Sequence, residues 1–127
     1  MSRSPALVLF AHGARDPAWA EPFRRMLDRV RASRPGLRAE LAFLECMEPT
    51  LPAAISRLAG EGASRITIVP LFLAQGGHLR EDLPRLVAAL RREFPGLALD
   101  VTAAIGDSGE LTDAIADWAL ARHESRS

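Results

Sequence analysis

Cysteine is nearly absent, because Cys46 is the single thiol among 127 residues. It cannot form an internal disulfide, and no Cys-x-x-Cys pair is present. A disulfide-stabilised secreted domain is therefore excluded, and the composition suits the reducing cytoplasm. We expect Cys46 to be a small buried residue, with a role as a soft metal ligand as the less favoured alternative.

Long apolar stretches are missing as well. No segment approaches the roughly 18 apolar residues of a membrane helix. The apolar run at residues 5–11 is shorter than the core of a secretory signal, and no small-residue cleavage site follows it. We expect no membrane partner and a cytoplasmic location.

Neither sign of charge is in excess, because 16 Lys and Arg residues balance 16 Asp and Glu residues. Nucleic-acid-binding domains usually have a basic surplus, so we expect no nucleic-acid partner. The sequence also lacks the Gly-x-x-x-x-Gly-Lys-Ser/Thr, Gly-x-Gly-x-x-Gly and Gly-x-Ser-x-Gly loops. Their absence argues against a P-loop or Rossmann nucleotide site and against a typical α/β-hydrolase.

What is present is an alternation of strand-forming and helix-forming segments. Thr50 is placed to cap the second predicted helix, and Pro84 fits the first turn of the third. Trp19 and Trp118 are expected to pack against the core. The predicted strands cover residues 5–11, 37–45, 65–73 and 97–105, and the predicted helices cover 19–33, 50–59, 80–94 and the latter part of 106–123.

This alternation predicts a mainly parallel sheet with helices on both faces. Right-handed crossovers leave few topologies, and we favour a flavodoxin-like three-layer α/β sandwich with strand order 2-1-3-4. Because the chain has no repeat, linker or low-complexity segment, we expect one domain over residues 1–127.

Three potential metal ligands follow strands that this topology makes neighbours. His12 follows the first strand, Glu45 ends the second, and His78 lies in the loop after the third. Parallel strands share one carboxyl edge, where open α/β folds bind ligands, and neighbouring strands lie about 4.8 Å apart. Two imidazoles and a carboxylate suit a first-row divalent metal and leave coordination positions open. Gly76 and Gly77 would let the backbone bend and a bulky ligand approach.

Each of these residues also has an ordinary structural interpretation. A histidine after a strand is often a loop residue with a satisfied hydrogen bond, and this holds for His12 and His78. Glu45 could cap the following helix. Arg15 and Arg80, which follow the two histidines, are either surface charges or contacts for ligand carboxylates.

Three segments together resemble the small class II tetrapyrrole chelatases, which include the sirohydrochlorin cobaltochelatases and ferrochelatases. The resemblance runs from about residue 6 to residue 106. The segments are LVLFAHGARDP, AELAFLECMEPTLPAAI and ITIVPLFLAQGGHLREDLP, and the strongest pattern is formed by Pro70, Phe72, Leu73, Gly76, His78, Asp82 and Pro84.

The resemblance implies ATP-independent insertion of a divalent metal into sirohydrochlorin, in cobalamin or sirohaem biosynthesis. It implies that His12 and His78 hold the metal and that Glu45 assists proton removal. It assigns no cofactor beyond the metal substrate, which would be Co²⁺ first, then Fe²⁺ or Ni²⁺. Short members of the family build their cleft by homodimerisation, so we expect a homodimer. The expected substrate contacts are Arg15, Gly76, Gly77 and Arg80.

Two features depart from the family pattern. Ala14 replaces the serine of the usual His-Gly-Ser-Arg motif, and the segment IGDSGEL has no late histidine near residue 106. A non-catalytic metal- or tetrapyrrole-binding carrier therefore stays open as the alternative function. A flavodoxin-like module with no metal role is the third hypothesis.

Overall fold

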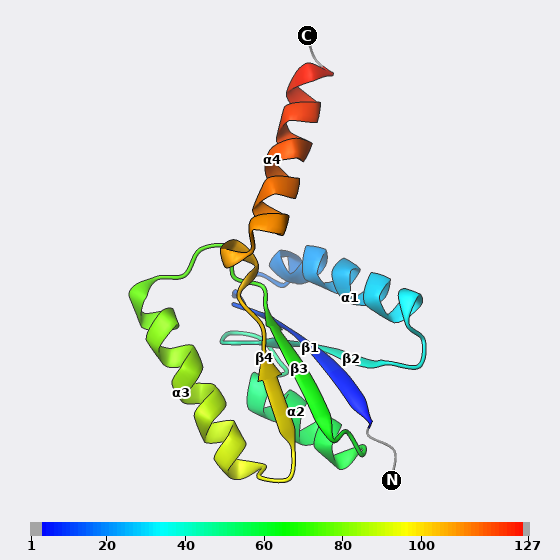
Figure 1. The fold of residues 1–127 in the computed structure, drawn as a ribbon, viewed down its shortest axis with the longest axis vertical. Helices are drawn as coiled ribbons and strands as arrows, with labels where there is room; N and C mark the ends of the chain where they lie inside the picture. Colours follow the sequence, from blue (N-terminus) through cyan, green and yellow to red (C-terminus); the bar gives the residue numbers. More distant parts are fainter. Residues whose placement is uncertain (1–3, 126–127) are drawn as a thin grey trace.

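Four parallel strands form one sheet in the computed structural model, which describes residues 4–125 (Figure 1). Their order across the sheet is β2-β1-β3-β4, and every neighbouring pair is parallel. The predicted α/β class and strand order are therefore confirmed. The strands are β1 (Pro5–Ala11), β2 (Arg38–Phe43), β3 (Arg65–Pro70) and β4 (Ala98–Val101).

Helices cover the two faces of the sheet unequally. Helix α1 (Glu21–Ser33) packs on one face, whereas α2 (Leu51–Gly60) and α3 (Gly77–Glu93) pack on the other. Helix α4 (Gly109–Glu124) projects beyond the carboxyl ends of the strands, away from the sheet (Figure 1). Two short 3-10 turns, η1 (Pro17–Ala20) and η2 (Ile105–Asp107), precede α1 and α4.

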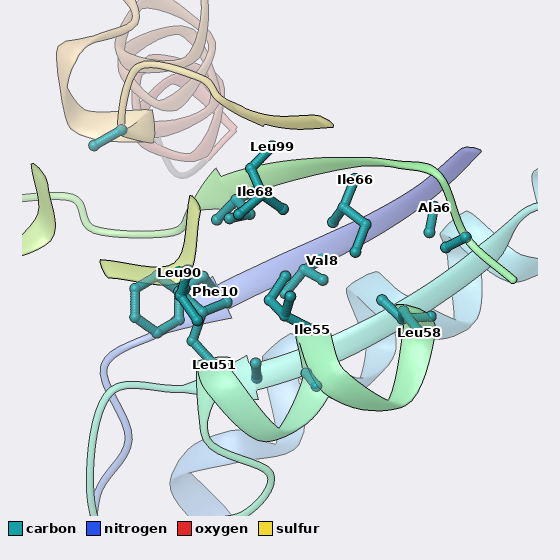
Figure 2. Packing of buried hydrophobic residues seen from close by; sticks show 14 of the residues in the cluster. Ala6, Val8, Phe10, Leu51, Ile55, Leu58, Ile66, Ile68, Leu90 and Leu99 are labelled. Atoms are coloured by element: carbon teal, nitrogen blue, oxygen red, sulfur yellow. The ribbon is translucent and has the colours of Figure 1, made fainter. Parts of the chain in front are cut away.

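The larger hydrophobic core lies between the sheet and helices α2 and α3 (Figure 2). Alternate residues of each strand point into it, as the pleat of a strand requires. The central strand β1 is buried on both faces, which explains its continuous apolar sequence. The largest fully buried side chains here are Val8, Phe10, Leu51, Ile55, Leu58, Ile66, Ile68 and Leu90.

Side-chain caps begin η1, α2 and α4, whereas α1 and α3 start without one. The Thr50 side chain accepts a hydrogen bond from the Ala53 N–H at the start of α2, as predicted. Asp16 caps η1 through the Ala18 N–H in the same way, and Ser108 caps α4. No helix among residues 4–125 is long and apolar enough to cross a membrane.

Three predicted strand ends are wrong. The second, third and fourth strands stop at Phe43, Pro70 and Val101, several residues before the apolar runs end. The remaining apolar residues still pack into the core from loops: Phe72, for example, is buried and meets the Phe10 ring at 5.4 Å between centroids. An apolar run therefore marks burial here and does not mark the end of the strand.

Helix α3 begins at Gly77, three residues before the predicted start. The Arg80 N–H already donates to the Gly76 carbonyl, so the first helical turn forms around the glycine pair. As a result Pro84 lies inside the helix, and the prediction that it stands in the first turn is wrong.

The two tryptophans behave differently. Trp19 packs on Phe23 with ring centroids 4.7 Å apart, as expected. Trp118 on α4 is 62% exposed, so the prediction that it packs against the core is wrong. The reason is that α4 leaves the sheet and has no core to bury it. Residues 1–3 and 126–127 of the predicted domain lie outside the described part of the chain.

Pro84→Ala is expected to raise the free energy of unfolding. The substitution restores a backbone donor inside α3 and removes a ring that crowds the Arg80 carbonyl, a gain of up to about 3 kcal/mol. Pro52→Ala is the matched control, because Pro52 stands in the first turn of α2, where a missing N–H costs little. Urea denaturation measures both variants, and equal changes in the two would contradict the interpretation.

Candidate functional site

His12 is the first residue after β1, at the carboxyl edge of the sheet. Ala11 before it is completely buried, whereas the His12 side chain is about half exposed. Two neighbours orient the ring. Its Nδ1 lies 3.2 Å from the Gly13 carbonyl oxygen, and the ring meets Phe72 edge to face with centroids 6.4 Å apart. The imidazole therefore stands on a rigid strand end with one side open to solvent.

Glu45 contacts His12 directly, with its Oε1 3.6 Å from the His12 Nδ1. Backbone pairing beyond the two strands brings them together: the Leu44 N–H donates to the Ala11 carbonyl, and the Glu45 N–H donates to the His12 carbonyl. Glu45 lies two residues past the end of β2, so the prediction that it ends this strand is wrong. The two side chains nevertheless meet at the shared edge.

Gly13 permits this close pairing. Its φ is +91°, in the left-handed region that glycine adopts without strain. A Cβ at this position would overlap the carbonyl oxygen of Glu45. Glycine at residue 13 is thus required both by the turn after His12 and by the loop that carries Glu45.

Cys46 occupies a tight turn beside the pair. Its φ is +66°, and the Met47 N–H donates to the Glu45 carbonyl at 2.8 Å, which closes a three-residue turn around Cys46. The residue is exposed, so the expectation that it is buried is wrong. The turn that positions Glu45 directs the next residue to the surface, which no local sequence pattern indicated.

His78 is the second residue of α3, so the prediction that it lies in a loop is wrong. Its side chain is exposed in the first helical turn. Among residues 4–125, no group of three or more His, Cys, Asp or Glu side chains is gathered as a metal site. His12 and Glu45 therefore form a pair to which His78 is not joined.

Asp107 links the loop after β3 to the loop after β4. One of its carboxylate oxygens lies 3.7 Å from the Arg80 Nη2, and the other accepts a hydrogen bond from Gln75 at 3.3 Å. The two loops also touch through their backbones, because a Cβ on Gly106 would overlap the Leu73 carbonyl oxygen.

The sequence reasoning missed Asp107 and Gln75. For Asp107 a signal existed, because it follows the fourth predicted strand and so belongs to the same carboxyl edge as the chosen ligands. The family pattern has a histidine in this segment. The Asp107 carboxylate was therefore not considered as a partner for Arg80 or Gln75.

The remaining predicted contacts have open surroundings. Gly76 has a φ of −73°, which any residue adopts, so the prediction that it is needed for a bend is wrong. A Cβ on Gly76 or Gly77 would meet nothing within 4 Å. Arg15 is exposed in the loop after β1 and makes no hydrogen bond or ion pair with another described residue.

The surroundings of His12 indicate its tautomer. Because two oxygen atoms face Nδ1, we assign the proton to that nitrogen. The lone pair of Nε2 is then available to a metal ion, and the carboxylate behind the ring makes the imidazole a stronger donor. The geometry thus suits binding of a divalent cation beside a group that can accept protons.

Comparison with known proteins finds relatives over most of the chain. A sequence model of the CbiX family matches residues 6–120. A sirohydrochlorin cobaltochelatase of Methanococcus aeolicus is 35% identical over 88 residues, which are 69% of this chain and 62% of the relative. The matched region thus spans less than two thirds of that curated relative.

Two solved structures share the fold. A protein described as a CbiX protein of cobalamin (vitamin B12) biosynthesis from Marinobacter aquaeolei has a TM-score of 0.83 and 34% identity, covering 97% of this chain and 99% of its own. The sirohydrochlorin chelatase SirB from Bacillus subtilis subspecies spizizenii, in complex with cobalt, has a TM-score of 0.75 and 25% identity. That match covers 90% of this chain and 49% of SirB.

Gly13→Ala is expected to lower the free energy of unfolding by at least about 1–2 kcal/mol, the cost of a left-handed backbone at a residue with a Cβ. The clash with the Glu45 carbonyl adds to this cost. Gly77→Ala is the matched control, because it lies in a helix with open space around it and should be neutral or stabilising by up to about 1 kcal/mol. Urea denaturation compares them, and a stable Gly13→Ala variant would refute the close packing.

Proposed function

This chain is a member of the CbiX family, and from that premise we propose that it inserts a divalent metal ion into sirohydrochlorin without ATP. The matched relatives support the proposal, since one is a sirohydrochlorin cobaltochelatase and another is a sirohydrochlorin chelatase in complex with cobalt. Cobalt is the first metal to test, followed by iron and nickel. The product would serve cobalamin or sirohaem biosynthesis in the cytoplasm.

The contact between His12 and Glu45 carries this proposal. It places an imidazole with an available Nε2 and a carboxylate on one open edge of the sheet. Metal insertion needs both functions, because the ion must be held with free coordination positions while two pyrrole nitrogens lose their protons. The pair supplies a donor for the metal and an acceptor for a proton within one small area.

His78 is proposed as the second metal-binding side chain. It is exposed at the start of α3, and the open space around Gly76 and Gly77 leaves room for a flat macrocycle to approach it. The metal would pass to the macrocycle from His12 and His78, while Glu45 receives pyrrole protons. Imidazole binds all three candidate metals, so the choice among them depends on geometry and supply.

The acidic side chains of the substrate need positive partners. Arg15 is exposed and has no partner among the described residues, so it can bind a carboxylate without breaking an existing ion pair. Arg80 is held beside Asp107, which positions its guanidinium near the first turn of α3. The N–H groups of that turn add a favourable dipole for an anion.

Two copies of the chain are proposed to form the working unit. The match to SirB covers 49% of that longer chain, so two copies would supply a comparable amount of structure. Closed two-fold dimers are the commonest small assemblies. In such a dimer the macrocycle would bind between two carboxyl edges, with no cofactor beyond the metal itself.

Anaerobic absorbance with sirohydrochlorin and Co²⁺, Fe²⁺ or Ni²⁺ tests the function. The wild type is expected to form product beyond one equivalent, whereas His12→Ala and His78→Ala should each lose about 100-fold or more in rate. His123→Ala is the matched control, because His123 lies near the end of α4, and it should keep the wild-type rate.

Other outcomes distinguish the rival functions. Product limited to one equivalent, with stoichiometric metal binding, would support a carrier and refute turnover. A metal affinity that neither histidine substitution changes would support a module without a metal role.

Glu45→Gln separates proton transfer from ring orientation. If Glu45 receives pyrrole protons, kcat should fall about 100-fold while the Kd for Co²⁺ changes little. If the carboxylate acts only by orienting His12, the Kd for Co²⁺ should instead rise about 10- to 100-fold. Glu48→Gln, an exposed carboxylate in the same loop, serves as the control. Steady-state rates and metal titration of each variant measure both quantities.

A further inference from the structure

The loop after β3 presents a large apolar side chain, Leu73, to solvent. Among residues 4–125 six large apolar side chains are exposed, and four of them belong to α4. Of the other two, Met26 on α1 is 43% exposed and Leu73 is 60% exposed. Single exposed apolar residues are common on protein surfaces, so exposure alone assigns no role to Leu73. What distinguishes Leu73 from Met26 is its location and the way its backbone is held.

Leu73 ends an apolar run that the two hydrophobic cores bury only in part. Leu71 packs against the core on the side of α1, whereas Phe72 is buried in the core on the side of α2 and α3. These two residues satisfy both faces of the sheet, and Leu73 packs with neither core. The run of residues 71–73 therefore contains one more large apolar side chain than the fold buries.

The backbone around Leu73 is fixed, although the side chain is exposed. The Leu71 N–H donates to the Phe10 carbonyl at 2.7 Å, and the Phe72 carbonyl accepts a hydrogen bond from the Gly106 N–H at 3.1 Å. Gly106 also lies against the Leu73 carbonyl oxygen, which a Cβ at that position would overlap. Contacts with β1 and with the loop after β4 thus hold Leu73 in its outward position.

The neighbours of Leu73 belong to the candidate site. In the strand order, the loop after β3 lies between the end of β1, which carries His12, and the loop after β4. On the β1 side, the Phe72 ring meets the His12 ring edge to face. On the β4 side, the loop that touches the Leu73 carbonyl continues into Asp107, which holds Arg80 at 3.7 Å. Leu73 is therefore an apolar residue between an imidazole and a guanidinium.

We propose that the Leu73 side chain contacts the ring face of the macrocycle and sets the affinity of the site for it. The inference rests on the proposed function and adds a substrate-binding residue that acts through neither metal binding nor charge. The substrate combines an apolar ring with acidic side chains at its periphery. Leu73 contacts the ring, while Arg80 meets a carboxylate at the rim.

An apolar residue suits this position for a physical reason. The face of the macrocycle offers few hydrogen-bond partners, so a polar side chain covered by it would lose its contacts with water without replacement. An apolar side chain instead gains free energy when the ring displaces water from it. Because the backbone of Leu73 is already fixed, binding requires little ordering of the loop.

This contact differs from an arginine contact in its response to salt. Salt screens the attraction between an exposed guanidinium and a carboxylate, so the contributions of Arg15 and Arg80 should fall as the ionic strength rises. The contribution of Leu73 should persist. The ring face is covered both before and during metal insertion, so loss of the contact should act mainly on KM and much less on kcat.

Titration of metal-free sirohydrochlorin under anaerobic conditions tests the contact. Leu73→Asn, which keeps the approximate size of the side chain, should raise the Kd about 10-fold, as expected for the loss of a few apolar carbon contacts. The factor should be the same at low and high salt. Leu73→Met keeps an apolar side chain of similar size and should retain most of the affinity.

Met26→Asn is the matched control, because it places the same polar group at the other exposed apolar residue outside α4. It should leave the Kd for sirohydrochlorin unchanged. Thermal denaturation checks the fold of each variant, and the exposure of both positions predicts small changes in Tm. An unchanged Kd in Leu73→Asn, an equal rise in Met26→Asn, or an effect that disappears at high salt would overturn the proposal.

Two further measurements separate the contact from indirect effects. The Kd for Co²⁺ alone should stay within about twofold in Leu73→Asn, because the substitution leaves the His12–Glu45 pair in place. A rise as large as that for sirohydrochlorin would mean that the substitution acts through Phe72 and His12, and would refute a ring contact. Light scattering measures the mass, and a lower mass in Leu73→Asn would refute it too, because Leu73 would then be covered by a second copy.

The inference and the proposed function fail in distinguishable ways. Binding of sirohydrochlorin that depends on Leu73 but leads to no turnover would support the contact and refute the chelatase function. Turnover with the same KM in Leu73→Asn and in the wild type would refute the contact and leave the function intact.

Discussion

The site depends on the burial of β1 between two parallel neighbours. This strand is enclosed on both faces and paired on both edges, so its carboxyl end is fixed relative to β2 and β3. Pairing then continues one step further, because residues 44 and 45 bond to the carbonyls of residues 11 and 12. His12 and Glu45 meet because the backbone ladder extends beyond the strands, with Gly13 as the residue that lets the two loops approach.

The carboxyl edge of the sheet has a rigid part and a more adjustable part. His12 and Glu45 are fixed by backbone hydrogen bonds to the sheet, whereas His78 and Arg80 belong to the start of α3. The ion pair between Arg80 and Asp107 is exposed, and such pairs contribute little to stability. It can therefore orient the loops after β3 and β4 without locking them. A bulky macrocycle would need such freedom on one side and a fixed acceptor for protons on the other.

The helices cover the two faces of the sheet unevenly. Helices α2 and α3 complete a large core on one face, α1 packs on the other face over β1 and β2, and α4 packs on neither.

Local sequence patterns determined the α/β class, the strand order and the Thr50 cap, because periodicity, handedness and capping act over a few residues. The order of the strands also indicated that His12 and Glu45 share one edge, and the family resemblance singled out the same residues. Only the tertiary structure decided where apolar runs stop being strands and where α3 begins. It also decided that Cys46 and Trp118 are exposed and that Asp107 holds Arg80. These features depend on which distant segment of the chain packs against a residue. The local sequence around that residue does not determine such tertiary contacts.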